Sequence, residues 1–334
     1  MNYLFFRTDR VGDLLVSSIL LKSVKRINPK NKVYVVCSEF NSDFAKNLSF
    51  IDGVFIFKKG FFNKLKLFIK INLLKIDKIL ILDGKDRSIL FSFLILAKDK
   101  IYILNKKKFS IFFKTRQEKL IFDNEKSDTK INIIKKIQNK IGISFLLNDT
   151  NIFKNEIFLH KINKNKLNFL TNNSYNLLHF DEKWVKNLYI KSYKNIELDF
   201  KNLNLFINSI INKSKMNLIV TSGKDSTKTL DQLKASMKHI NEAIYVKKIN
   251  NFFLYYVEQP NFYELIEIIR KSKLCVTCHG APTHISSIFN VRTIDIIDDS
   301  KILLYRAYTS HLNKYNEVIR INSDVTTRKI LSLF

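Results

Sequence analysis

The sequence predicts an α/β protein of two doubly wound domains, each a largely parallel sheet covered by helices. Apolar runs typical of buried strands alternate with amphipathic helical stretches along the first third of the chain. A second alternating series begins near residue 175. The length, 334 residues, is also enough for two domains of ordinary size.

The first half is expected to contain five strands, which lie at residues 3–7, 32–38, 53–58, 78–84 and 101–105. Helices are expected between them, at 13–28, 40–48, 61–75 and 86–97. Between 106 and 170 the pattern weakens, and the one clear helix there is expected at 129–143. We place the domain boundary within 150–172, which gives domains of 1–160 and 161–334, with the last helix able to pack back on the first domain.

The second half repeats the alternation. Strands are expected at 175–180, 216–223, 252–257, 273–278 and 292–298. Helices are expected at 203–214, 228–240, 261–272, from 283 onward and at 324–334. In open parallel sheets ligands bind beyond the carboxyl ends of the strands, so we expect a site in a cleft between two facing domains.

The chain carries a formal net charge of +27, which suggests an anionic partner: nucleic acid, a membrane surface or a phosphorylated substrate. The excess is mostly Lys, accompanied by much Asn, Ile and Phe and by only 7 Gly and 3 Pro. This joint bias is typical of a genome rich in A and T, so a generic solvated surface is the alternative. No nucleic-acid-binding motif accompanies the charge, and we predict no nucleic-acid partner.

Three cysteines in so long a chain argue against a disulfide scaffold and favour a reducing compartment. The N-terminus enters a strand at once and lacks the pattern of a signal peptide. The longest apolar run, at 89–97, is too short for a membrane span, which needs about 20 residues. We expect a cytoplasmic protein, whose membrane contact, if any, is peripheral on the inner face.

The stretch RTDRVGDLLVSS (7–18) follows the first strand and places Gly12 and Asp13 at a helix N-terminus, at the carboxyl edge of the sheet. In one interpretation Asp9 or Asp13 is a helix N-cap and Gly12 allows a tight turn. In the other, Asp13 is a general base. With one glycine, the loop is not a dinucleotide-binding fingerprint.

The stretch CVTCHGAPTHISS (275–287) contains the C-x-x-C-H spacing of c-type haem attachment. We reject haem because Cys275 lies inside an apolar strand, and we reject a thioredoxin-like pair because that motif opens a helix. A strand, the loop HGAP and a helix remain. Gly280 would let a ligand approach the backbone, Thr283 and the helix start would hold an anion, and His284 could reach a phosphate, unless it is an ordinary surface residue.

Two further stretches follow predicted strands. Lys183 precedes the only Trp, just past the strand at 175–180, where its ammonium could meet a phosphate. Asp83, Arg87 and Ser88 follow the strand at 78–84 and are expected near Asp13 if the sheet order is ordinary. An Arg in a Lys-rich chain favours a bidentate or buried role.

Taken in order, these segments resemble glycosyltransferase family 9, the heptosyltransferases of the lipopolysaccharide core. The family's R-x-D-x-x-G-D loop is matched by Arg7, Asp9, Gly12 and Asp13, and its D-x-x-x-x-R-S segment by 83–88. Its K-x-W-type segment resembles 183–184, and its late D-G-G-A-x-H loop is similar to HGAPTH (279–284). The order of elements matches over nearly the whole chain.

The resemblance implies a GT-B fold and an inverting, metal-independent transfer without a cofactor. The sugar, heptose-like, would pass from a nucleoside-diphosphate donor, expected to be ADP-linked, to a glycan or glycolipid of lipopolysaccharide type. Asp13 would be the catalytic base. The remaining site residues we assign are, for the donor, Lys183, Thr221, Gly223, His279, Gly280, Thr283 and His284, and, for the acceptor, Arg10, Gly12 and Arg87.

The chain departs from the family at three places. The acid of the late loop is His279 here, Val185 replaces the usual Pro after Trp184, and residues 106–170 match no motif. A non-catalytic relative that binds a nucleotide or glycan is therefore the alternative function.

Overall fold

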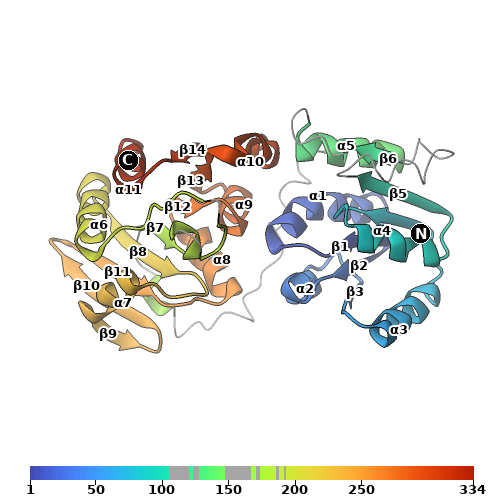
Figure 1. The fold of residues 1–334 in the computed structure, drawn as a ribbon, viewed down its shortest axis with the longest axis horizontal. Coiled ribbons are helices and arrows are strands. Elements are labelled where there is room, and N and C mark those ends of the chain that lie inside the picture. The colour runs from blue at the N-terminus through green and yellow to red at the C-terminus, as the bar shows by residue number, and fades with distance from the viewer. Residues whose placement is uncertain (105–119, 123–127, 147–166, 171–173, 186–187, 192) are drawn as a thin grey trace. The chain divides into compact units, whose positions relative to one another are not determined.

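The computed structural model describes residues 1–104, 120–122, 128–146, 167–170, 174–185, 188–191 and 193–334 (Figure 1). The chain forms two compact units. The first comprises Met1–Glu156 and Arg306–His311, and the second comprises Ile157–Tyr305 and Leu312–Phe334. The expected boundary between residues 160 and 161 lies outside the described residues.

The sheet of the first unit is parallel throughout, in the order β3-β2-β1-β4-β5-β6. Its strands are β1 (Asn2–Arg7), β2 (Lys32–Cys37), β3 (Gly53–Ile56), β4 (Lys78–Ile81), β5 (Asp99–Leu104) and β6 (Leu120–Phe122). Its helices are α1 (Val11–Ile27), α2 (Glu39–Lys46), α3 (Phe61–Asn72), α4 (Asp86–Leu94) and α5 (Lys130–Lys140). The order reverses between β1 and β4, so the loops that follow these two strands lie next to each other.

The second unit repeats this winding. Its sheet has the order β14-β13-β12-β7-β8-β11-β10-β9, and only the β9–β10–β11 pairings are antiparallel. The strands are β7 (Tyr175–Phe180), β8 (Asn217–Ser222), β9 (Lys238–Asn241), β10 (Ile244–Ile249), β11 (Phe252–Val257), β12 (Leu274–Cys278), β13 (Arg292–Asp298) and β14 (Tyr315–Arg320). The helices are α6 (Phe200–Ser214), α7 (Lys228–Ala235), α8 (Phe262–Lys271), α9 (Ala281–Ile288), α10 (Ile302–Thr309) and α11 (Ser323–Leu331).

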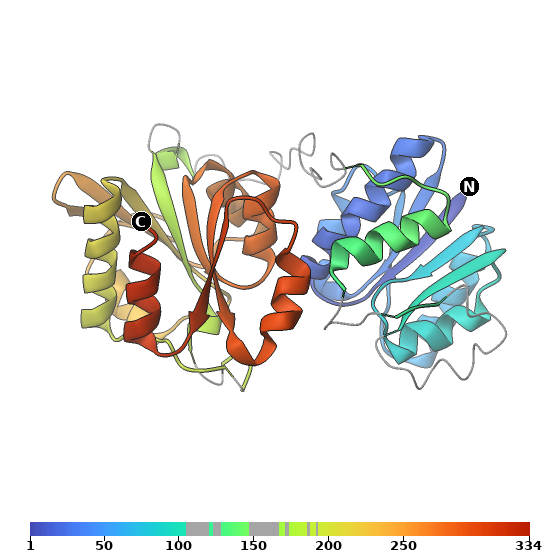
Figure 2. The ribbon, with the colours of Figure 1, turned by 90° about the horizontal axis from the view of Figure 1, so that it is seen from above.

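Each unit has its own apolar core. In the first, one cluster joins β1 and β4 to α3 and α4 through residues such as Phe6, Ile79, Ile71 and Ile89. In the second, Trp184 is fully buried and stacks on Phe180 with ring centroids 4.6 Å apart. Figure 2 shows the helices of each unit on both faces of its sheet, as the predicted doubly wound class requires.

The predicted fold class is confirmed, with differences in detail. The helix expected at 228–240 is wrong beyond Ala235, because 238–241 form β9, which pairs with β10. The apolar spacing continues through Ile240, but cross-strand hydrogen bonds decide the conformation there. Strands β6, β10 and β14 and helix α10 were not expected. Helix α11 belongs to the second unit, where Lys213 Nζ donates to the Leu331 carbonyl of α11, and the late stretch that groups with the first unit is 306–311.

Candidate functional site

In the first unit, the candidate residues follow β1. Helix α1 begins at Val11, so Gly12 and Asp13 lie in its first turn, as expected. The N-cap position is Arg10, and no side chain caps this end, so the interpretation of Asp9 or Asp13 as the N-cap is wrong. Gly12 is inside the helix and forms no tight turn. A carboxylate such as that of Asp13 is still favourable in the first turn, because the helix dipole stabilises a negative charge there.

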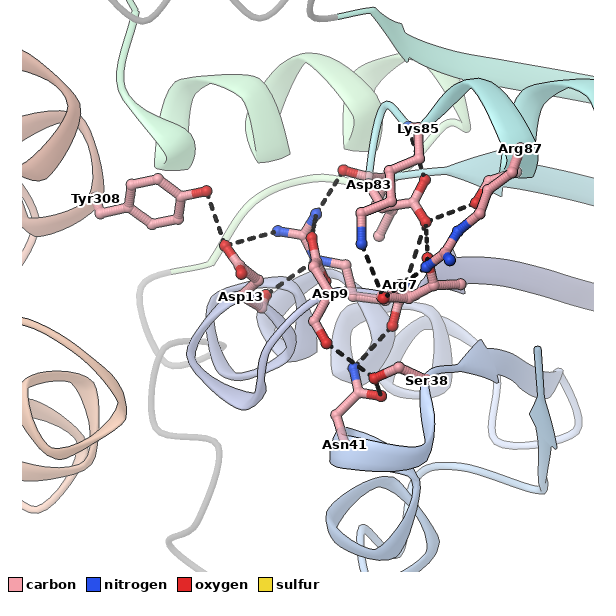
Figure 3. A network of polar contacts seen from close by, with 12 residues as sticks. Arg7, Asp9, Asp13, Ser38, Asn41, Asp83, Lys85, Arg87 and Tyr308 are labelled. Carbon is pink, nitrogen blue, oxygen red and sulfur yellow. Dashed lines mark hydrogen bonds and ion pairs between the residues drawn. The ribbon is translucent and has the colours of Figure 1, made fainter. Parts of the chain in front are cut away.

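Arg7, the last residue of β1, organises this loop (Figure 3). Its guanidinium is buried and donates to the Leu82 carbonyl at 2.5 Å and, through Nε, to the Asp13 carbonyl at 3.1 Å. It lies 3.1 Å from Asp9 Oδ2 and 3.8 Å from Asp13 Oδ1. Burial lowers the pKa of Arg7, but the carboxylates of Asp9 and Asp13 outweigh it and raise the pKa above its usual value. One fixed cation therefore holds both acids.

Asp9 is the most perturbed acid of this network. Burial, opposed by Arg7 and helped by the charge of Asp13, raises the pKa of Asp9 to about 6. Its Oδ1 is buried and accepts no hydrogen bond from the described residues. The backbone on either side is fixed, since Ser38 Oγ donates to the Asp9 carbonyl and Asn41 Nδ2 donates to the Arg7 carbonyl.

The loop after β4 meets the loop after β1, as the sheet order requires. Asp83 Oδ2 accepts hydrogen bonds from the Thr8 amide, the Thr8 hydroxyl and the Ser88 hydroxyl. Arg87 donates to the Thr8 hydroxyl at 3.1 Å and lies over the Phe57 ring. Asp83 and Ser88 therefore bind the two loops together, and Arg87, although exposed, is anchored at its tip.

Asp13 has a second neighbour within the first unit. Tyr308, from the stretch 306–311, donates its hydroxyl to Asp13 Oδ1 at 2.9 Å (Figure 3). Burial, helped by the charge of Asp13, raises the pKa of Tyr308 well above its usual value, so the phenol stays protonated as the donor. Arg10 is exposed at the start of the same helix.

In the second unit, the candidate residues follow β7 and β12. Lys183 lies in a short 3₁₀ turn after β7 and is buried, with Nζ 2.8 Å from Asp181 Oδ2. Burial lowers the pKa of Lys183, but Asp181 outweighs it and raises the pKa, so the ammonium stays charged. Asp181 Oδ1 also accepts from the Lys183 amide. Lys183 is therefore a buried, ion-paired ammonium rather than a solvated surface lysine.

Gly280 brings this ammonium to the late loop. Gly280 is the N-cap of α9, and a Cβ built on it would lie 2.8 Å from Lys183 Nζ. Only glycine leaves room for the ammonium against the backbone at the helix start. A lysine ammonium and a positive helix N-terminus thus meet at one point, which is an arrangement suited to a phosphate.

His279 precedes this glycine and is held by an acid on the neighbouring strand. Its Nδ1 lies 2.7 Å from Oδ2 of Asp295, a fully buried residue of β13. Asp295 also accepts from the hydroxyls of Thr283, at 2.9 Å, and Tyr315, at 3.0 Å. Because a carboxylate only accepts, His279 Nδ1 carries a hydrogen, and Nε2 is the lone-pair atom of the neutral ring.

The remaining donor-side candidates lie close by. The His284 ring is buried, with its centroid 5.6 Å from that of His279. Thr283 accepts from the Gly280 amide, so its hydroxyl closes the loop internally. Thr221 is buried and lies 2.8 Å from His179 Nδ1. A Cβ on Gly223 would lie 2.0 Å from Glu182 Oε2, so Gly223 packs directly against the Lys183 segment.

Solved structures share this architecture. The chain is similar to the E. coli heptosyltransferase WaaC with ADP, at a TM-score of 0.70 and 10% identity, over 100% of this chain and 98% of that one. This is a GT-B-like fold. The E. coli ADP-heptose lps heptosyltransferase II matches it at a TM-score of 0.65 and 9% identity, over 99% and 97%. The UDP-GlcNAc 2-epimerase from Methanocaldococcus jannaschii matches it at 0.55 and 13%, over 100% and 92%.

No protein-family model matches the sequence, and no curated protein matches it by sequence. The expected resemblance to family 9 heptosyltransferases therefore holds at the level of structure. The GT-B-like fold is common to transferases and nucleotide-sugar epimerases, so the choice between activities depends on the residues themselves.

Sequence reasoning missed several residues that contact the predicted site residues. Asp295 lies between two isoleucines in the buried part of strand RTIDIID, and Asp181 directly follows the buried strand YNLLHF. An acid at such a place was a usable signal, because a buried carboxylate must have partners. The contribution of Tyr308 had no local signal.

The cysteines are not among the predicted site residues, although Cys278 lies near Lys183 and Asp181. Cys37, Cys275 and Cys278 are free and buried, and burial raises the pKa of Cys37 and of Cys275 to about 12. Cys275 and Cys278 both lie within β12 and form no disulfide. Across the described ranges, no group of three or more His, Cys, Asp or Glu could hold a metal ion.

Proposed function

We propose that this protein is an inverting, metal-independent glycosyltransferase that moves a heptose-like sugar from an ADP-linked donor to a glycan or glycolipid of lipopolysaccharide type. The observation that carries the proposal is the Lys183 ammonium set against Gly280 at the start of α9, with His279 and His284 beside it. These groups would stabilise the negative charge that develops on a departing diphosphate, the task that often falls to Mg²⁺.

Each donor-side residue would have a distinct part. Lys183 would neutralise a phosphate oxygen, and the helix start would orient the diphosphate. Thr283 and Asp295 would position His279. Thr221 and Gly223 would line the donor site beside Lys183. The name of the similar E. coli protein, a heptosyltransferase with ADP, supports an adenosine diphosphate as the nucleotide.

On the acceptor side, Asp13 would take the proton of the attacking hydroxyl. Its Oδ1 accepts a hydrogen bond from Tyr308 and lies near Arg7, and these two contacts would hold the carboxylate in place. General base catalysis of this kind contributes about 10²–10⁴-fold. Arg10, Gly12 and Arg87, on the two loops of the same unit, would contact the acceptor. The protein would work in the cytoplasm, peripherally on the inner face of the membrane.

The test begins with a thermal-shift panel of ADP, UDP, GDP, CMP and their sugar conjugates, without metal and then with Mg²⁺. We expect a metal-independent shift with ADP that is lost in His284→Ala and kept in His239→Ala, a control at an exposed His of β9 in the same unit. A response to none of these ligands would refute the donor site.

A transfer assay separates the transferase from its alternative, a non-catalytic nucleotide- or glycan-binding protein. The replacement of the acid of the late loop by His279 is the observation that favours this alternative. Asp13→Asn should keep ADP binding and lose at least about 100-fold in turnover. Asp43→Asn, at an exposed acid of α2, should change neither. Intact ADP binding without turnover on any acceptor by the wild type would establish the non-catalytic function.

A further inference from the structure

Large apolar side chains gather on the outer side of two helices of the first unit. Of the nineteen large apolar side chains that the described residues expose, nine lie between residues 61 and 96. We call them the α3–α4 apolar surface; they are Phe61, Phe62, Leu65, Ile69, Leu73, Leu90, Phe93, Leu94 and Leu96. Apolar side chains that gather in this way on a solvent-exposed face mark an interaction surface, whereas single exposed apolar residues are ordinary.

Helix α3 is apolar on two opposite sides. Leu67 and Ile71 are buried and face the core, whereas Phe61, Phe62, Leu65 and Ile69 are 73%, 76%, 42% and 50% exposed. At 100° per residue, the exposed set forms one stripe centred opposite the buried pair. Core packing explains why the buried side of α3 is apolar, but it does not explain the apolar stripe on the exposed side.

Helix α4 continues this surface. Leu90, Phe93 and Leu94 are exposed on one side of α4, while Ile89 and Phe91 enter the same core cluster as Leu67. The ends of the two helices are joined, because the Leu96 amide donates to Asn72 Oδ1 at 2.9 Å. Both helices therefore cover one face of the sheet (Figures 1 and 2).

The charged residues of the segment that contains α3 are all basic. Residues 58–76 contain six Lys and no Asp or Glu. Of these, Lys64, Lys66 and Lys70 lie on α3 itself and are exposed. Phe and Leu between lysines on one helix face are the pattern of a helix that lies in the interface of an anionic membrane, with its apolar side chains at the acyl boundary.

We propose that the α3–α4 apolar surface docks the protein on an anionic lipid bilayer, with Phe61 and Phe62 as the main anchors. Of the six lysines, Lys58 is paired with Glu39, but the segment 58–76 supplies no acid of its own. Anionic headgroups match such a run of lysines, whereas a protein partner or second copy would not require it. No helix in the described part of the chain is long and apolar enough to cross a membrane, so the contact is interfacial. The proposal rests on the proposed function only in placing a glycolipid acceptor where this surface docks.

The test is co-flotation of the full-length protein with vesicles of phosphatidylglycerol and phosphatidylcholine, compared with pure phosphatidylcholine. We expect binding to the anionic vesicles, weakened by salt. Phe61→Ser with Phe62→Ser should lower the partition coefficient at least about tenfold, and Lys64→Gln with Lys66→Gln and Lys70→Gln should remove the dependence on anionic lipid. Phe40→Ser is the matched control, because Phe40 on α2 is 85% exposed outside the surface.

Binding that is absent, or equal in the Phe61/Phe62 variant and the control, would overturn the proposal. So would self-association that disappears in this variant without any vesicle binding, which would make the surface an interface between copies. The thermal shift with ADP is measured in parallel on the same proteins. Vesicle binding without an ADP response would refute the transferase and keep the surface, and the reverse result would refute the surface alone.

Discussion

Replacing Asp9 by Asn should stabilise the first unit at neutral pH, although it removes an ion pair. Asp9 Oδ2 lies 3.1 Å from Arg7, and its side chain is 18% exposed. Burial, only partly offset by Arg7, raises the pKa of Asp9 from 3.8 to about 6. At 1.36 kcal/mol per pKa unit, ionising Asp9 in the folded state costs up to about 3 kcal/mol.

The sign of the pH dependence follows from this direction. A carboxyl whose folded pKa is raised favours folding while it is protonated, below about pH 4, and loses that stability as the pH rises through 6. Asn resembles the protonated form at every pH. The unfolding free energy of Asp9→Asn should therefore approach that of the wild type as the pH falls below about 4 and exceed it by up to about 3 kcal/mol at pH 7.

The assay must report on the first unit, because the only Trp, Trp184, lies in the second. Native-state hydrogen exchange of β1 amides between pH 4 and 8 provides that readout. Asp52→Asn is the control of opposite sign. Burial raises the pKa of Asp52, but hydrogen bonds from Lys25, the Val33 amide and Lys32 outweigh it, so the pKa is lowered and the variant should lose stability at neutral pH. An Asp9→Asn protein less stable than the wild type at pH 7, or a difference independent of pH, would refute the reasoning.

Three further predictions concern the second unit. Gly280→Ala places a Cβ 2.8 Å from Lys183 Nζ, so it should displace the ammonium and weaken ADP binding at least about tenfold. Calorimetry measures the affinity, the circular dichroism spectrum should not change, and an unchanged affinity would contradict the prediction. Lys183→Met leaves the buried Asp181 without its counter-charge and should lower the unfolding free energy by about 3–5 kcal/mol in urea; a loss below 1 kcal/mol would mean that water reaches the acid. Asp295→Asn cannot accept all three of its hydrogen bonds and should cost about 1–3 kcal/mol, and wild-type stability would show that these bonds are replaceable.

The sequence predicted the winding of both sheets because strand and helix periodicities are local. It also placed Gly12 and Asp13 at a helix start and Gly280 before another, since both positions follow a buried strand. Local patterns failed where pairing between strands decides the conformation, as in β9, where a helical spacing lies in an edge hairpin. They also failed for the expected N-cap, because Asp9 forms an ion pair with Arg7 instead.

By itself, therefore, the sequence determined the α/β class, the two doubly wound sheets and the segments after strands in which Asp13, Lys183 and His279 lie. Only the tertiary structure decided what those side chains face. Asp295 reaches His279 from a different strand, and Lys183 meets Gly280 across nearly a hundred residues of chain. The physical reason is that buried charge must be neutralised by whichever groups the sheet order brings near, and that order is a property of the whole fold.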